Sequence, residues 1–203
     1  NSSGSFTNNF NVTSTAGSSY VVGNVNNGTF YYNGMANLGA NGSLINGTNS
    51  AVLLDTGSNI TGTGSNIIGA VLNGQYTGTA PSGFTAGIEG ENRGSIVLGD
   101  SSAGLYGKNG ARLLNKGSIN VGNASIGISG KGTGSSLTNE GNITLGSGSE
   151  GMYGNESSDI TNTGNITGSA ANGTGIYAES PAVLTINNNG TIDMQANDSR
   201  GIY

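Results

Sequence analysis

The sequence predicts an all-β protein, a right-handed parallel β-helix with three strands in each turn and a sequence period of about 23 to 24. Three observations predict this fold. A five-residue motif recurs at this interval, a second motif follows it at a nearly constant distance, and a third apolar segment precedes the next copy. No segment has apolar residues at helical spacing over ten or more residues.

The first motif is Asn-x-Gly-x-Ile, and its copies begin at Asn92, Asn115, Asn139, Asn162 and Asn188. Their residue numbers differ by 23, 24, 23 and 26. Apolar residues alternate after each Asn, as at Ile96 and Leu98, which is the period of a strand with one buried face. We expect the Gly to supply a backbone conformation closed to other residues. We expect the five Asn side chains to point inward and to hydrogen-bond to one another as a ladder.

The second motif is Gly-apolar-Tyr, whose Gly follows the Gly of the first motif by 10 or 11 residues. If the apolar residue points into the core, the next residue points outward, so the Tyr residues form an exposed column that Ser129 interrupts. An exposed Tyr suits a sugar ring or a protein partner, but stacked Tyr residues also stabilise parallel strands, and both interpretations remain open. The candidate ligand-binding residues are Tyr106, Tyr153, Tyr177 and Tyr203.

Two further columns complete the regular turns. The third apolar site is occupied by Leu113, Leu137, Ile160 and Leu184. An outward column one residue after each Asn contains Lys116 and Glu140, which we expect to pair across adjacent turns on a solvated face.

The chain divides into an irregular part, residues 1–91, and a regular part, residues 92–203. The first part is interpreted as irregular or shorter turns, with a loop at 75–83 around Pro81. Gly87 and Ile88 resemble one more copy of the second motif. The chain stops inside a repeat, which indicates a fragment of a longer protein. Aromatic residues favour a cap or an elaborated N-terminal segment: Phe6, Phe10, Tyr20 and Phe30-Tyr31-Tyr32.

Composition excludes several classes of function. The chain has 39 Gly, no Cys, His or Trp, 8% charged residues and a net charge of −5. The missing His and Cys exclude the usual zinc ligands, no copy of the calcium-binding repeat Gly-Gly-x-Gly-x-Asp occurs, and nucleic-acid binding needs a dense basic surface, so we expect no metal site, no cofactor and no nucleic-acid binding. No stretch approaches the 18 or so apolar residues of a membrane helix.

An enzyme is not expected either. A polysaccharide-degrading β-helix needs carboxylates at matched positions on neighbouring turns. Glu156 and Glu179 lie at the same sequence offset from the Asn of their turn, but their distances from Tyr153 and Tyr177 differ, so this lesser alternative has little support.

The repeat period, with Asn-x-Gly-x-Ile followed by Gly-Ile-Tyr, resembles the passenger domains of monomeric (type V) bacterial autotransporter adhesins, especially the large ones of fusobacteria. The resemblance covers residues 88–203. It implies a secreted virulence factor on the cell surface, held at the outer membrane through a C-terminal barrel that this chain does not contain. It also implies adhesion to host-cell proteins or glycans or to other bacteria.

Two functions therefore remain open from the sequence. The chain is either a binding segment of an adhesin or a passive stalk that projects a distant binding domain. Clustered exposed aromatic residues favour binding, and the scarcity of long insertions favours the stalk.

Overall fold

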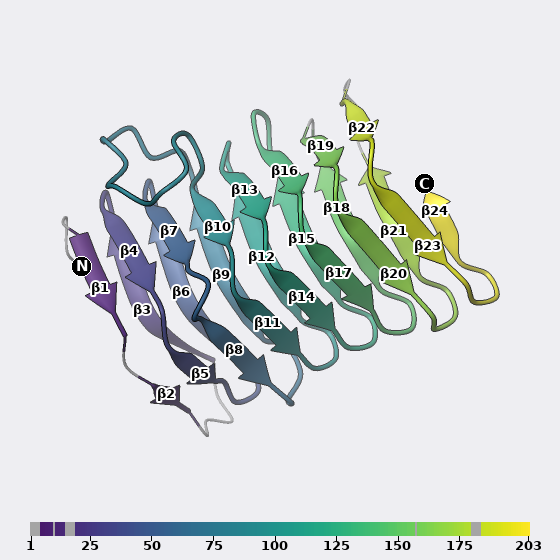
Figure 1. The fold of residues 1–203 in the computed structure, drawn as a ribbon, viewed down its shortest axis with the longest axis horizontal. Helices are drawn as coiled ribbons and strands as arrows, with labels where there is room; N and C mark the ends of the chain where they lie inside the picture. Colours follow the sequence, from purple (N-terminus) through teal and green to yellow (C-terminus); the bar gives the residue numbers. More distant parts are fainter. Residues whose placement is uncertain (1–4, 10, 15–18, 157, 180–183) are drawn as a thin grey trace.

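The protein is a β-solenoid of about eight turns, each of about 24 residues. The computed structural model describes residues 5–9, 11–14, 19–156, 158–179 and 184–203. Within these residues every regular element is a β-strand, and the strands form three parallel eight-stranded sheets. The chain passes through sheets A, B and C in turn and then returns to sheet A, with the two termini at opposite ends of the solenoid (Figure 1). The predicted fold class is confirmed.

Each turn contributes one strand to each sheet, in the order A, B, C. Sheet A contains β1 (Ser5–Asn8), β4 (Thr29–Tyr32), β7 (Ala51–Leu54), β10 (Gly90–Asn92), β13 (Arg112–Asn115), β16 (Ser136–Asn139), β19 (Asp159–Asn162) and β22 (Ile186–Asn188). Sheet B contains β2 (Val12–Thr13), β5 (Met35–Asn37), β8 (Asn59–Gly62), β11 (Ser95–Leu98), β14 (Ser118–Val121), β17 (Asn142–Leu145), β20 (Asn165–Gly168) and β23 (Thr191–Met194). Sheet C contains β3 (Tyr20–Asn26), β6 (Gly42–Thr48), β9 (Ile68–Asn73), β12 (Ala103–Lys108), β15 (Ile126–Lys131), β18 (Glu150–Asn155), β21 (Thr174–Glu179) and β24 (Arg200–Ile202).

The core is a column of aliphatic side chains between the three sheets. In-register pairing places Ile119 on Ile96 in sheet B, Ile128 on Leu105 in sheet C and so on along the axis. These side chains are fully buried, and each packs on its equivalent in the neighbouring turn. The alternation of apolar residues read from the sequence therefore corresponds to the inner face of each strand.

The third apolar column follows the prediction except at its last member. Leu113, Leu137 and Ile160 align in sheet A and are fully buried. In the last turn Ile186, and not Leu184, pairs with Ile160. The expectation for Leu184 is wrong, because strand pairing preserves the distance of each member from the Asn that follows it.

The Gly of the first motif has a different role from the one expected. Gly94, Gly117, Gly141, Gly164 and Gly190 do not have a positive φ. Instead, a Cβ atom on Gly117 would collide with the carbonyl oxygen of Gly94 in the preceding turn, and the later copies repeat this contact. The expectation of a special backbone conformation is wrong, because close stacking of successive turns is what excludes a side chain here.

The Gly of the second motif explains why the two motifs occur together. A Cβ atom on Gly104 would lie 2.6 Å from the carbonyl oxygen of Gly127 and 2.8 Å from Cγ2 of Ile119. Ile119 is the last residue of the first motif in the next turn. The Gly of one motif thus leaves the space that the Ile of the other fills, which links sheets B and C across neighbouring turns.

The first three turns belong to the same solenoid. Phe30 and Tyr32 of β4 point into the core, where their rings stack at a centroid distance of 6.2 Å. The aromatic triplet therefore lies in a strand and does not form a cap. Phe10 lies outside the described residues, and so does the side chain of Phe6.

The largest departure from regularity is the connection between β9 and β10, which spans residues 74–89 and contains the 75–83 segment. Gly87 and Ile88 lie in this connection, so their interpretation as a second motif is wrong. Its place is taken by Gly69-Ala70-Val71 of β9, since Ala70 pairs with Leu105 and Val71 with Tyr106. This copy lacks the Tyr that marks the motif in the sequence.

Candidate functional site

The Tyr residues of the second motif form a column on the outer face of sheet C. Strand pairing aligns Tyr106 with Ser129, then Tyr153, then Tyr177. The rings of Tyr153 and Tyr177 stack with centroids 5.6 Å apart and an interplanar angle of 17°, and those of Tyr177 and Tyr203 at 5.2 Å and 25°. Tyr106, Tyr153 and Tyr177 are half-buried, and Tyr203 is exposed. We call these residues, with Ser129, the Tyr column.

Ring stacking limits what the Tyr column offers to a ligand. Tyr177 stacks on Tyr153 and on Tyr203, so it offers mainly its ring edge and hydroxyl group to solvent, whereas Tyr153 has Ser129 and no ring on its other side. Ser129 is buried between the turns of Tyr106 and Tyr153, so Tyr106 is separated from the stacked group.

Polar groups surround the stacked Tyr residues. The Tyr153 hydroxyl donates to Oε2 of Glu179 at 2.7 Å and accepts from the Asn155 amide at 2.9 Å. Burial, followed by the hydrogen bond to Glu179, raises the pKa of the Tyr153 hydroxyl. Burial, followed by the nearby charge of Glu179, also raises the pKa of Glu150. The guanidinium carbon of Arg200 lies 5.0 Å from the ring centroid of Tyr203.

The five Asn residues of the first motif form a hydrogen-bonded ladder, of which the first four are buried in the interior and Asn188 is exposed. Nδ2 of Asn92 donates to Oδ1 of Asn115 at 2.8 Å, and the same bond repeats at 2.8 Å through Asn139 and Asn162 to Asn188. Oδ1 of Asn92 is buried and has no hydrogen-bond partner in the described part of the chain. The equivalent residue of the preceding turn is Leu54, which has no donor to offer. The ladder therefore begins at Asn92 and has a structural role.

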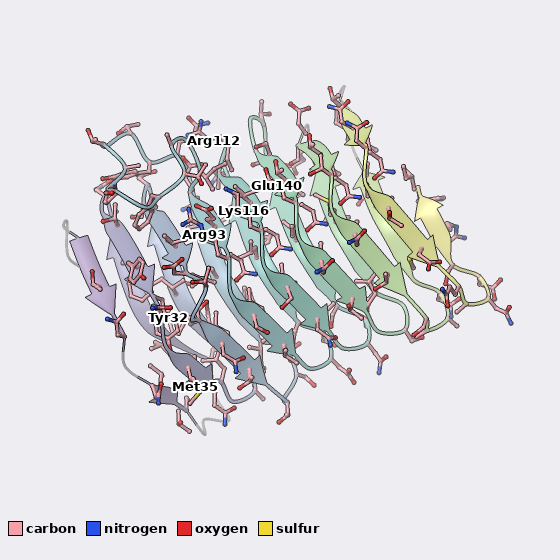
Figure 2. The ribbon with its side chains drawn as sticks, viewed as in Figure 1. Tyr32, Met35, Arg93, Arg112, Lys116 and Glu140 are labelled. Carbon is pink, nitrogen blue, oxygen red and sulfur yellow. The ribbon has the colours of Figure 1, made fainter. Side chains whose placement is uncertain are left out.

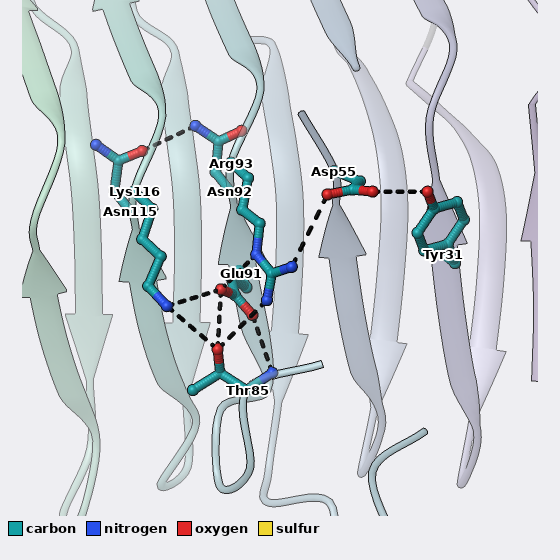
Figure 3. Close-up of polar contacts among 8 residues, drawn as sticks. All are labelled: Tyr31, Asp55, Thr85, Glu91, Asn92, Arg93, Asn115 and Lys116. Carbon is teal, nitrogen blue, oxygen red and sulfur yellow. Dashed lines mark hydrogen bonds and ion pairs between the residues drawn. The ribbon is translucent and has the colours of Figure 1, made fainter. Parts of the chain in front are cut away.

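The outer face of sheet A holds a polar cluster that the sequence interpretation missed. Glu91 points outward from β10, yet it is only 2% exposed because residues 74–89 cover it. Its carboxylate accepts from Nε of Arg93 at 2.8 Å and from the hydroxyl and backbone N–H of Thr85 at 2.9 and 3.1 Å (Figure 3). Nζ of Lys116 lies 3.4 Å from the same carboxylate. Glu91 thus connects the 74–89 segment to two turns of the solenoid.

The expected pair of Lys116 with Glu140 is wrong. Arg93, Lys116 and Glu140 lie on successive turns (Figure 2), and among the described residues Lys116 forms an ion pair with Glu91 and none with Glu140. The physical reason is that Glu91 is desolvated under the 74–89 segment, where a charge attracts a cation more strongly than an exposed carboxylate does.

A second carboxylate holds the same segment at its end. Glu89 is 1% exposed and forms a bidentate pair with Arg112, with Nε to Oε2 at 3.1 Å and Nη2 to Oε1 at 2.7 Å. The backbone N–H groups of Arg112 and Tyr76 also donate to Glu89, at 2.7 and 3.2 Å. Leu53 and Leu114 point outward from sheet A and are nevertheless buried. Residues 74–89 therefore dock as a covering layer on this face.

The surroundings of Glu91 and Asp55 favour the ionised form of both carboxyl groups. Burial raises the pKa of Glu91, but the hydrogen bonds from Arg93 and Thr85 outweigh burial, so the pKa of Glu91 lies below its usual value. Beside it, Tyr31 donates to Asp55 at 2.6 Å, and this bond lowers the pKa of Asp55 and raises that of Tyr31. Nη1 of Arg93 lies 3.9 Å from Asp55.

The outer face of sheet B is mostly polar, and its outward residues do not repeat one residue type along the whole sheet. Aligned outward residues are Thr61, Val97, Asn120, Thr144, Thr167 and Asp193. Val97 and Met35 are the exposed large hydrophobic residues of this sheet among the described residues.

No other chemical centre is found in the described part of the chain. The described residues include no group of three or more residues that could hold a metal ion and no helix that is long and apolar enough to cross a membrane. Glu179 aligns with Asn155, and Glu156 pairs with Lys131 at 3.5 Å, so Glu156 and Glu179 do not form a matched column of carboxylates.

The fold places this chain in the class of β-solenoid proteins. Comparison of the chain with protein-family models, with curated proteins and with solved structures found no match.

Proposed function

We propose that this chain is a segment of a surface-displayed bacterial adhesin that binds a protein receptor on host cells or other bacteria through the Tyr column. The observation that supports this proposal is the difference between the three outer faces. Residues 74–89 cover the outward residues of β7, β10 and β13 in sheet A, sheet B presents mostly polar side chains, and sheet C presents aligned Tyr residues beside Arg200 and Glu179. Aromatic and Arg side chains are those that contribute most to protein interfaces.

The geometry of the Tyr column suggests how it would bind. Ring edges would pack against an apolar patch of the receptor, and the hydroxyl groups would exchange hydrogen bonds with its backbone. The stacked arrangement restrains the rings before binding, so that little side-chain entropy is lost when the partner docks.

A stalk is the second candidate, and one observation favours it. Stacked Tyr rings also stabilise adjacent strands without any ligand, as the interior Asn ladder does. In that case the chain would serve only to hold a distant binding domain away from the membrane.

The test compares binding of labelled protein to host and bacterial cells for wild type and a Tyr153→Ser, Tyr177→Ser double variant. Ser is chosen because Ser129 already occupies the equivalent position in β15. A Thr144→Ser, Thr167→Ser variant on sheet B is the matched control.

The proposal expects saturable binding by wild type and control and its loss in the Tyr variant, with unchanged circular dichroism. Absence of binding by all three proteins would favour the stalk. Equal binding by all three would contradict a role for the Tyr column.

A further inference from the structure

The outer face of sheet B carries two columns of outward residues that change together. The first column contains one residue at the start of each strand, and the second contains the residue two positions later, on the same face. At four turns the first column holds Asn, and these residues are Asn11, Asn59, Asn142 and Asn165. At the same four turns the second column holds Thr, at Thr13, Thr61, Thr144 and Thr167.

The other four turns of sheet B lack both residue types at these positions. Their first-column residues are Met35, Ser95, Ser118 and Thr191. Their second-column residues are Asn37, Val97, Asn120 and Asp193. Asn and Thr are frequent in this chain, but a chance distribution does not make Thr in one column depend on Asn in the other. The coupling points to a cause that involves both side chains.

Contacts within the fold do not supply that cause. Among the described residues, no hydrogen bond joins the Asn and the Thr of one strand. Thr61 donates instead to the carbonyl oxygen of Ala36 at 3.2 Å, and Asn165 donates to Oδ1 of Asn142 at 3.0 Å. The residue between the Asn and the Thr is a fully buried Ile in β8, β17 and β20. The strand therefore presents the two polar side chains together on its outer face without linking them.

The sequence Asn-x-Thr, in which x is not Pro, is the acceptor for N-linked saccharides. In sheet B all four Asn residues are exposed, and the four Thr residues are exposed or partly exposed. The same kind of sequence occurs at 123–125, but there Ser125 is 2% exposed and its hydroxyl accepts from the N–H of Ser102 at 3.0 Å. In sheet B both side chains of the acceptor sequence are accessible, and the residue between them stays in the core.

We propose that the outer face of sheet B is a site of N-linked glycosylation, with Asn11, Asn59, Asn142 and Asn165 as the acceptors. In this reaction Nδ2 of the Asn forms a bond to C1 of a sugar, and the bond between C1 and a phosphate oxygen of an activated donor breaks. The phosphate leaves with the bonding electron pair, and Nδ2 gives up one proton to a base of the glycosyltransferase. The donor is a sugar activated by a nucleotide or by a lipid diphosphate, since both provide a phosphate leaving group.

The fold accommodates this modification without loss of packing. A saccharide on these Asn residues would extend from the outer face of sheet B into solvent, and it would add neutral polar surface to a chain with only 8% charged residues. The Tyr column lies on sheet C and the 74–89 segment on sheet A, so both stay uncovered (Figure 1). Glycosylation of sheet B therefore does not depend on receptor binding by the Tyr column.

The test is mass spectrometry of peptides from the protein isolated from the cells that naturally produce it. Thr144→Ala, Thr167→Ala leaves both acceptor Asn residues in place, and Thr144→Ser, Thr167→Ser keeps the hydroxyl group of the acceptor sequence. Ser118→Asn, Asn120→Thr builds the acceptor sequence into β14, and Ser118→Asn alone is its matched control. Circular dichroism checks that each variant folds. Transfer by the soluble cell fraction with nucleotide sugars identifies the first donor, and transfer by the membrane fraction identifies the second.

We expect a saccharide on the four acceptor Asn residues and none on Asn37 and Asn120, which are exposed on the same face but have Gly two positions later. The Ala double variant should lose the modification of Asn142 and Asn165, and the Ser double variant should retain it. The β14 double variant should gain a saccharide at position 118, and its control should not.

Three results would each overturn the proposal: unmodified Asn at all four acceptor positions, equal modification of Asn37 and Asn120, or full modification of Asn142 and Asn165 in the Ala double variant. Receptor binding is tested at Tyr153 on another face. Failure of either proposal is therefore distinguishable from failure of the other.

Discussion

The outer faces of sheets A and C arise from the same alternation of inward and outward side chains, but they differ in solvent exposure. In sheet A the outward residues Leu53, Glu91 and Leu114 are 1%, 2% and 3% exposed because the 74–89 segment docks over them. In sheet C the outward Tyr153 and Tyr177 stay half-exposed, and the residues that stack on them are other Tyr residues of the same column. The difference teaches that an outward position in a β-helix is not the same as a solvent-exposed one. The 74–89 connection buries part of the outer face of sheet A, where the carboxylates of Glu89 and Glu91 are paired with cations.

The largest expected loss of stability follows from a substitution in the Asn ladder, at the corner between sheets A and B. The effects expected on the outer faces of sheets A and C are no larger. Asn139→Leu leaves Oδ1 of Asn162 buried without a partner, and it leaves Nδ2 of Asn115 with only its long bonds to the carbonyl oxygens of Gly117 and Asn142, at 3.4 and 3.5 Å. An unsatisfied buried group costs about 1–3 kcal/mol and a lost hydrogen bond about 1 kcal/mol, so we expect a loss of about 2–4 kcal/mol in the free energy of unfolding, measured in urea.

Asn92→Leu is the matched control for that prediction. It removes the unpaired Oδ1 of Asn92 and leaves Oδ1 of Asn115 unpaired instead, so the number of unsatisfied groups does not change. We expect a change below about 1 kcal/mol. A loss as large as that of Asn139→Leu would mean that side-chain volume, and not hydrogen bonding, governs this column.

The second effect tests the covered face of sheet A. Glu91→Ala removes the acceptor that holds Thr85, Arg93 and Lys116. We expect a loss of about 2–4 kcal/mol, because one partner of a buried ion-pair cluster is removed, together with faster proteolysis within 74–89. Glu140→Ala, at an exposed position two turns away, should change stability by less than about 0.5 kcal/mol. Equal protease resistance of the two variants would contradict docking through Glu91.

The pH dependence of stability should have opposite signs on the two faces. The pKa of Glu91 is lowered in the folded protein, so its contribution is present above its ordinary value of 4.5 and is lost as the pH falls through the folded pKa. The pKa of Glu150 is raised, so its ionised form opposes folding at neutral pH, and this penalty disappears as the pH falls.

Glu150→Gln should therefore stabilise the protein at pH 7 and have little effect in acid. Urea unfolding at pH 7 and at pH 3.5 measures both values. Destabilisation at pH 7 would show that the Glu150 carboxylate makes a favourable contact in the folded state.

The smallest effect concerns the open face of sheet C. Ser129→Tyr would complete the stack between Tyr106 and Tyr153, and we expect a gain of about 0.5–1 kcal/mol from the two new ring contacts. Ser129→Thr serves as the control, since it adds a β-branched side chain without a ring. If Tyr lowers stability relative to Thr, the column has no room for a ring at this turn.

Particular residues show how far the sequence interpretation reaches. The five Asn residues and the Tyr column are visible because one residue type repeats at a nearly constant interval. A ladder of buried Ser residues repeats similarly, with Ser102 N–H donating to Ser125 and Ser125 N–H to Ser149, at 3.0 and 3.1 Å. These Ser residues also recur at a nearly constant interval, but Ser is so frequent in this chain that the interval does not stand out from the other Ser residues.

The polar cluster under the 74–89 segment had no such signal. Glu89, Glu91 and Thr85 belong to a single turn, so no repetition marks them. Their partners Arg93, Arg112 and Lys116 occupy positions that are solvated in an ordinary turn.

The sequence by itself determined the solenoid, its three strands per turn and the inward columns, because stacking of identical turns converts a periodic sequence directly into a periodic core. Only the tertiary structure decided which outward residues stay in solvent, which cation pairs with Glu91, and that the motif Gly residues are required by close stacking. These features depend on contacts between neighbouring turns and on the path of one non-repeating connection, and a repeat period contains no information about either.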